Sequence, residues 1–161
     1  MATLGEIEEA VTAARKAGCQ ELGLLVCSSA YPSPPDLIHL RRIPHLRATF
    51  GYEVGLSDQT LGIAVPVASV ALGASIIEKH FTLLRADGGP DAAFSLERAE
   101  FKQMVDNVRV AEKALGSVEY GQEAEAPSRA FRRSLFAVKD IAAGEEFTPE
   151  KGADRLLSTS A

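Results

Sequence analysis

The feature that most restricts the fold is a repeated order of apolar strand, polar pair and helix. Apolar segments of strand length lie at Leu22–Cys27, around Glu53–Leu56 and at Ser75–Phe81. Between and after them, apolar residues recur at helical spacing. Strands that alternate with helices form a parallel sheet whose faces are covered by the helices. The sequence therefore predicts an α/β protein.

The helical segments have recognisable starts and stops. The first is predicted to begin at a capping box formed by Thr3 and Glu6 and to end at Gly18. The second, Pro35–Phe50, contains Pro44, which is expected to kink or split it. The third spans Ile63–Leu72, and the last, which ends at Gly116, is expected to start from Ser95 as its N-cap.

Polar residues two positions apart lie at or just beyond the carboxyl end of each predicted strand. Such residues point to the same side of a strand, so each pair should share a face. Polar pairs at the carboxyl ends of neighbouring parallel strands are typical of the active site of a (β/α)8 barrel, although a doubly wound sheet also binds ligands there. No dinucleotide fingerprint or phosphate-binding P-loop sequence is present. The three pairs are Ser29 with Tyr31, Ser57 with Gln59, and Glu78 with His80.

Ordinary structural roles for these residues remain open. Glu78 and His80 could satisfy each other in a core. The serines could be turn residues, Tyr31 a packing aromatic, and Asp91 a turn former after Pro90. The other two histidines lie beside arginines on a predicted helix and are expected at the surface; they are His39 and His45.

The net charge, the hydropathy and the cysteines of the sequence indicate which partners and which compartment to expect. The net charge of −5 gives no electrostatic reason to expect nucleic acid or an anionic membrane. Leu61–Ile77 carries no charge, but proline and glycine interrupt it and it is shorter than the roughly 20 residues of a membrane span. Cys19 and Cys27 lack metal-site spacing, which indicates a reduced, cytoplasmic setting.

Several motifs, in order along the chain, resemble the sialic acid synthase family. They are Gly55–Gly62, Val70–Ala74, Ile77–Thr82 and Gly89–Asp91. Within the family, Arg85–Asp91 and Ala93–Leu96 look most like pseudaminic acid synthase. These enzymes condense phosphoenolpyruvate with an amino sugar to make nine-carbon acids. The resemblance runs from Met1 to about Thr148.

The resemblance implies a domain organisation. Residues 1–117 look like the last three βα units of a TIM (β/α)8 barrel with one preceding helix, so a partial barrel is expected. Residues 118–131 are expected to be a linker. Residues 132–161 resemble the start of the family's antifreeze-like (SAF) domain, and the likeness is lost after Thr148, so this segment is expected to be truncated.

The resemblance also implies roles at the strand ends. Two family histidines hold a divalent cation of the Mn²⁺ or Mg²⁺ type; His80 matches one, but Gln59 stands at the other position. An amide oxygen binds such a metal more weakly than imidazole does, so weakened metal binding is expected. Ser29 and Ser57 are expected to contact phosphoenolpyruvate. The expected catalytic residues are Glu78, Tyr31 and Asp91.

The implied activity is therefore that of pseudaminic acid synthase: condensation of phosphoenolpyruvate with a 2,4-diacetamido-trideoxy hexose. A homo-oligomer, a dimer in the family, is expected, with neither nucleic acid nor membrane as a partner. The isolated chain is expected to be inactive, because three strands of eight leave open sheet edges. Two alternatives are a sugar- or phosphate-binding remnant without catalysis, consistent with Gln59, and a purely structural half-barrel.

Overall fold

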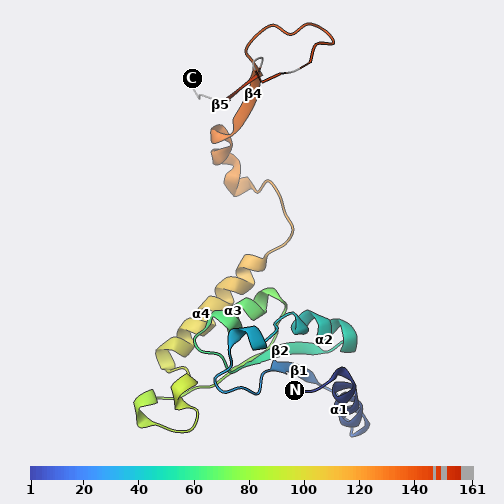
Figure 1. Ribbon diagram of the computed structural model, residues 1–161, viewed down its shortest axis with the longest axis vertical. Coiled ribbons are helices and arrows are strands. Elements are labelled where there is room, and N and C mark those ends of the chain that lie inside the picture. The colour runs from blue at the N-terminus through green and yellow to red at the C-terminus, as the bar shows by residue number, and fades with distance from the viewer. Residues whose placement is uncertain (147, 150–151, 157–161) are drawn as a thin grey trace. The chain divides into compact units, whose positions relative to one another are not determined.

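The chain forms two units, and each is described here by itself. The computed structural model describes residues 1–146, 148–149 and 152–156, and it divides the chain into Met1–Gly116 and Ser117–Ala161 (Figure 1). Part of the segment expected to begin the SAF domain, namely residues 147, 150–151 and 157–161, lies outside the described residues.

The first unit is built on a three-stranded parallel sheet, as the sequence predicts. The strands are β1 (Gly23–Cys27), β2 (Glu53–Asp58) and β3 (Ile77–Lys79), in the order β1-β2-β3. β3 is shorter than expected. Residue Phe81, predicted to lie within it, instead forms an isolated parallel bridge with Leu96 in the segment before the last helix.

Four α-helices accompany the sheet. They are α1 (Leu4–Lys16), α2 (Arg42–Phe50), α3 (Ala64–Ala71) and α4 (Arg98–Leu115). Helices α2 and α3 contact β2, and α4 packs against α3 (Figure 1). The core lies between β1, β2 and α2, and its buried residues are Val26, Ile43, Leu46 and Val54.

The start of α1 follows the prediction, but two other helix boundaries do not. Thr3 caps α1 in a capping box with Glu6. The second predicted helix is split into η1 (Pro35–Leu37) and α2, and His39 between them has a left-handed φ of 49°. Pro44 lies in the first turn of α2, where a missing N–H breaks no helical bond.

Ser95 is not the N-cap of α4. Glu97 holds that position, in a capping box with Glu100. The Ser95 hydroxyl instead donates to the carbonyl of Asp91 at 2.8 Å and closes the short turn η3 (Ala92–Phe94). The prediction was wrong because serine serves equally well in a turn and at a cap.

The second unit contains η4 (Glu123–Phe131), which falls in the segment expected to be a linker, and a two-stranded antiparallel sheet. That sheet pairs β4 (Arg133–Ala137) with β5 (Gly152–Leu156). Within the described residues of the whole chain, no helix combines the length and the apolar character needed to cross a membrane.

Candidate functional site

The two faces of β2 differ in chemistry. Val54 and Leu56, which alternate with Gly55, are fully buried, and Val54 belongs to the core beneath α2. Side chains alternate along a strand, so Ser57 and the following Gln59 lie on the opposite face from that core. Gly55 lies on the same face as these two polar residues, which follow it at the carboxyl end of the strand.

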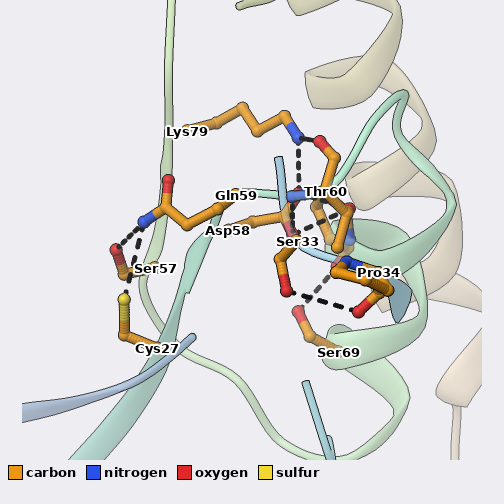
Figure 2. Close-up of polar contacts among 10 residues, drawn as sticks. Cys27, Ser33, Pro34, Ser57, Asp58, Gln59, Thr60, Ser69 and Lys79 are labelled. Atoms are coloured by element: carbon orange, nitrogen blue, oxygen red, sulfur yellow. Dashed lines mark hydrogen bonds and ion pairs between the residues drawn. The ribbon is translucent and has the colours of Figure 1, made fainter. Parts of the chain in front are cut away.

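A chain of hydrogen bonds crosses from the end of β2 to β3 on this face. The amide nitrogen of Gln59, Nε2, donates to Ser57 Oγ at 3.0 Å (Figure 2). The Ser57 hydroxyl in turn donates to Glu78 Oε1 at 2.5 Å. Gln59 and Ser57 are buried, with exposed fractions of 4% and 6%. The amide oxygen, Gln59 Oε1, is buried and has no hydrogen-bond partner among the described residues.

The second group of predicted residues surrounds His80. Its Nδ1 lies 3.6 Å from Asp91 Oδ2. The Tyr31 ring meets the imidazole edge-on with centroids 6.1 Å apart, and the Phe94 ring lies 5.0 Å away. The imidazole of His80 is about one-third exposed, at 29%, so a ligand can reach it.

Strand register relates the two groups. Ser57 is paired with Glu78, and Asp58 with Lys79. Gln59 and His80 are the next residues along the two strands and fall on the same face by alternation. Of the seven predicted residues, Ser29 stands apart: it is exposed, and in the described part of the chain its side chain forms no hydrogen bond with the other six.

The loop that carries Asp91 is fastened to the start of α4 by Arg85. The Arg85 guanidinium pairs with both carboxylate oxygens of Glu100, one at 3.0 Å, and donates to the carbonyl of Ser95 at 3.1 Å. The bond from Arg85, together with the Glu97 backbone N–H, lowers the pKa of Glu100 to about 2. Arg85 thus anchors the loop.

Comparison with known proteins decides the family. The model of the NeuB family matches residues 1–120, which is most of the chain. The chain belongs to the NeuB family. The resemblance inferred from the sequence motifs is therefore confirmed.

The relatives of this NeuB-family chain include pseudaminic acid and legionaminic acid synthases. It is 47% identical over 131 residues to pseudaminic acid synthase of Campylobacter jejuni, covering 81% of this chain and 38% of the relative. It is 42% identical over 152 residues to N,N'-diacetyllegionaminic acid synthase of the same species, covering 92% and 46%. The chain thus spans less than half the length of these relatives.

A solved structure supports the same assignment. The N-acetylneuraminic acid synthetase of Leptospira borgpetersenii, determined in complex with citrate, aligns with a TM-score of 0.72 at 34% identity. The alignment covers 80% of this chain and 45% of that protein. The mixed α/β fold with a parallel sheet therefore matches the fold of a sialic acid synthase.

Two observations bear on whether the site of this NeuB-family chain suits a divalent metal ion. Gln59 Oε1 is buried and unpaired within the described residues, and an amide oxygen is a hard ligand. Nδ1 of His80 faces Asp91, so Nε2 is the imidazole nitrogen that remains to bind a metal ion. No cluster of three His, Cys, Asp or Glu side chains suited to a metal occurs among the residues described. The described residues therefore supply an amide oxygen and an imidazole nitrogen as candidate donor atoms, and no cluster of three such side chains.

Sequence reasoning missed two neighbours of the site. Cys27, the last residue of β1, lies with its sulfur 3.5 Å from Gln59 Nε2 and is paired in register with Ser57. Phe94 contacts both the His80 and Tyr31 rings. Strand alternation places Cys27 two positions before Ser29 on one face, so the pattern contained a signal for Cys27. Phe94 follows a loop, and no periodicity marks it.

Proposed function

We propose that this site belongs to a synthase of the pseudaminic acid type, which condenses phosphoenolpyruvate with a 2,4-diacetamido-trideoxy hexose. The observation that supports this most is the unpaired oxygen of Gln59, held at the carboxyl edge of the sheet beside the strand that carries Glu78 and His80. The identity to pseudaminic and legionaminic acid synthases supports the substrate class. The full reaction is proposed for the whole protein, because the chain spans less than half of these relatives.

The proposed roles follow from position. Gln59 and His80 hold a divalent cation, which when bound supplies a Lewis acid for the sugar carbonyl. Glu78 accepts the Ser57 hydroxyl hydrogen bond and is exposed, so it orients polar substrate groups or exchanges a proton with them. Tyr31 and Asp91 flank His80 and face the sugar, whereas Ser57 and Ser29 contact phosphoenolpyruvate.

The metal proposal is tested by calorimetry with Mn²⁺. We expect Gln59→His to raise Mn²⁺ affinity by roughly tenfold, because imidazole is the better ligand for a transition metal. We expect His80→Ala to abolish measurable binding. His45→Ala, on the exposed surface of α2, is the matched control and should change nothing. Equal affinity in the parent and Gln59→His chains would show that the metal site lies elsewhere.

A second candidate function is sugar or phosphate binding without turnover, and Gln59 specifically favours it because it replaces the stronger ligand. Phosphate release from phosphoenolpyruvate in the presence of Mn²⁺ and the amino sugar separates the two functions. Release in the Gln59→His chain but not in the parent would favour the binding role for the parent chain. Release in the parent itself would establish the synthase role.

For the protein in solution we further propose a cytoplasmic enzyme that forms a homo-oligomer. The relatives are biosynthetic synthases, which supports the compartment. Within the described part of the chain, β1 pairs only with β2, and its uncovered outer edge supports association of chains.

A further inference from the structure

A buried ion pair lies on the other face of the sheet from the candidate site. Lys79 Nζ is 2.6 Å from Asp58 Oδ2, and the two side chains are 1% and 0% exposed. Removing two charges from water costs several kcal/mol per ion, and apolar side chains of the same size usually give equal or greater stability. What the pair does at this position therefore depends on the other groups to which it is bonded.

The pair is bonded to the backbone on the carboxyl side of Gln59. The Asp58 carboxylate accepts hydrogen bonds from the Thr60 N–H at 3.1 Å and from its hydroxyl at 2.8 Å. Lys79 Nζ donates to the Thr60 carbonyl as well as to Asp58 (Figure 2). Both backbone polar groups of Thr60 are therefore held by this one ion pair.

The backbone of Gln59 itself is held from a third direction. Its carbonyl accepts a hydrogen bond from the Ser33 N–H at 2.9 Å, in the loop that follows β1. The peptide groups around Gln59 thus have little freedom to rotate. The backbone sets the direction of the Gln59 Cα–Cβ bond, and the amide at the end of the side chain is then oriented by its hydrogen bond to Ser57.

Lys79 also links the two strands that supply the site. It lies in β3 between Glu78 and His80, and its partner Asp58 lies in β2 between Ser57 and Gln59. A shift of one strand relative to the other would break the ion pair. The same shift would break the hydrogen bond from Ser57 to Glu78 on the opposite face.

We infer that Lys79 and Asp58 are positioning residues, which set the direction of the Gln59 amide and the alignment of Ser57 with Glu78. They act through the backbone and lie on the face of the sheet opposite Ser57 and Glu78. The inference concerns the geometry of the ligand-free chain, so it is tested without any assay of the proposed reaction and does not depend on that reaction.

The test uses nuclear magnetic resonance of the full chain, with the side-chain NH₂ signals of Gln59 as the readout. In the parent, these signals should exchange slowly with water, because Nε2 is buried and bonded to Ser57. The paired substitution Asp58→Leu with Lys79→Met replaces both charges by apolar groups of similar size. We expect its melting temperature to fall by roughly 10 °C, because the buried N–H and carbonyl of Thr60 lose their partners, and we expect the Gln59 NH₂ signals to shift and to exchange roughly tenfold faster or more.

A matched control separates positioning from the general loss of an ion pair. Arg47 and Glu53 form an exposed pair at 2.9 Å near the opposite end of β2. Arg47→Gln should leave the Gln59 signals unchanged. If the double variant keeps its fold and its Gln59 signals match the parent in shift and exchange, the inference is overturned.

A measurement on the parent chain covers the case in which the double variant does not fold. The Thr60 backbone N–H, which is bonded to Asp58, should be protected at least as well as the Gln59 NH₂, because the ion pair is inferred to hold the backbone that carries Gln59. Rapid exchange of the Thr60 N–H beside a protected Gln59 NH₂ would show that the ion pair does not hold the site, and would overturn the inference.

Discussion

Ser57 lies between two polar side chains and uses its hydroxyl group twice. It accepts a hydrogen bond from Gln59 and donates one to Glu78. It is the link through which the amide of one strand is connected to the carboxylate of the next. The candidate site therefore depends on a residue whose side chain has only two heavy atoms.

Ser57→Ala tests this link. The substitution leaves the buried Gln59 Nε2 with only the weak sulfur contact to Cys27, so we expect the free energy of unfolding to fall by about 1–2 kcal/mol. Urea unfolding followed by circular dichroism measures the loss. Ser29→Ala, at an exposed serine of similar sequence context, should cost less than about 0.5 kcal/mol. Equal losses in the two variants would contradict the proposed link.

The candidate residues were named from the sequence, but the hydrogen bonds among them were not. Strand alternation placed Ser57 and Gln59 on one face, as the structure has them. The same alternation could not reveal that Asp58 would pair with Lys79, because that depends on the register between β2 and β3. Register is a property of two strands together, and a single strand's pattern leaves it open.

At the scale of elements, the close approach of β2 to the segment before β3 depends on Gly55. A Cβ built on Gly55 would lie 2.3 Å from the Ile76 carbonyl oxygen and 2.8 Å from a Leu25 methyl group. The first neighbour is backbone and cannot turn away. Glycine is therefore needed here for space, and its φ is not in the left-handed region.

We expect Gly55→Ala to lower the free energy of unfolding by about 3 kcal/mol, because strands β1 to β3 must move apart. Gly5→Ala, inside α1 with nothing within 4 Å of the new Cβ, is the control and should stabilise slightly, by about 0.5 kcal/mol. Thermal unfolding of both variants supplies the comparison. A Gly55→Ala chain as stable as the parent would mean that the two strands are not so close in solution.

The loop of Arg85 gives a prediction for pH. The pKa of Glu100 is lowered to about 2 from its ordinary 4.5, so this carboxylate stabilises the folded chain fully above pH 4.5 and loses its contribution as pH falls toward 2. The carboxylate is 40% exposed, so solvent screening reduces its contribution to about 1 kcal/mol. At pH 6, the free energy of unfolding of the parent should exceed that of the Glu100→Gln variant by this amount.

Urea unfolding of both chains between pH 6 and pH 2 checks the prediction. The difference between parent and Glu100→Gln should shrink steadily in the acid range. Glu8→Gln, on the exposed surface of α1, controls for the loss of one carboxylate and should give a difference near zero throughout. A parent-to-variant difference that did not change with pH would rule out the Arg85 bond as its source.

Helix and strand positions followed from the sequence where periodicity was long and caps were unambiguous, as in α1. The predictions were wrong where one residue type can occupy two different structural positions. Ser95 was assigned as a cap and instead closes η3, whereas Glu97, a less usual cap, begins α4. The short length of β3 was also not predicted. After Lys79, the backbone forms its hydrogen bonds with Leu96, which is distant in the sequence.

At the scale of the whole molecule, the outer edge of β1 is the feature that most favours association with another chain. β1 pairs only with β2, and no other strand of the described residues covers its second edge. Leu25 in the centre of β1 is 38% exposed. An uncovered strand edge with exposed apolar residues promotes association with another chain.

We therefore expect sedimentation velocity to show self-association that increases with protein concentration. Leu25→Lys should weaken it, because a lysine on an edge strand opposes pairing. Val110→Lys, on α4 at a position 65% exposed and away from the sheet edge, is the control and should leave association unchanged. A parent chain that remains monomeric at high concentration would contradict this expectation.

Because the oxygen of Gln59 has no partner among the described residues, the melting temperature of the chain can be used to search for a ligand. A solute that binds the folded chain beside this oxygen more tightly than it binds the unfolded chain raises the melting temperature. Warming the chain with a panel of amino sugars, phosphorylated acids and cations would rank them by the melting temperature each confers. The compound that raises the melting temperature most would be the first candidate substrate to test in a catalytic assay.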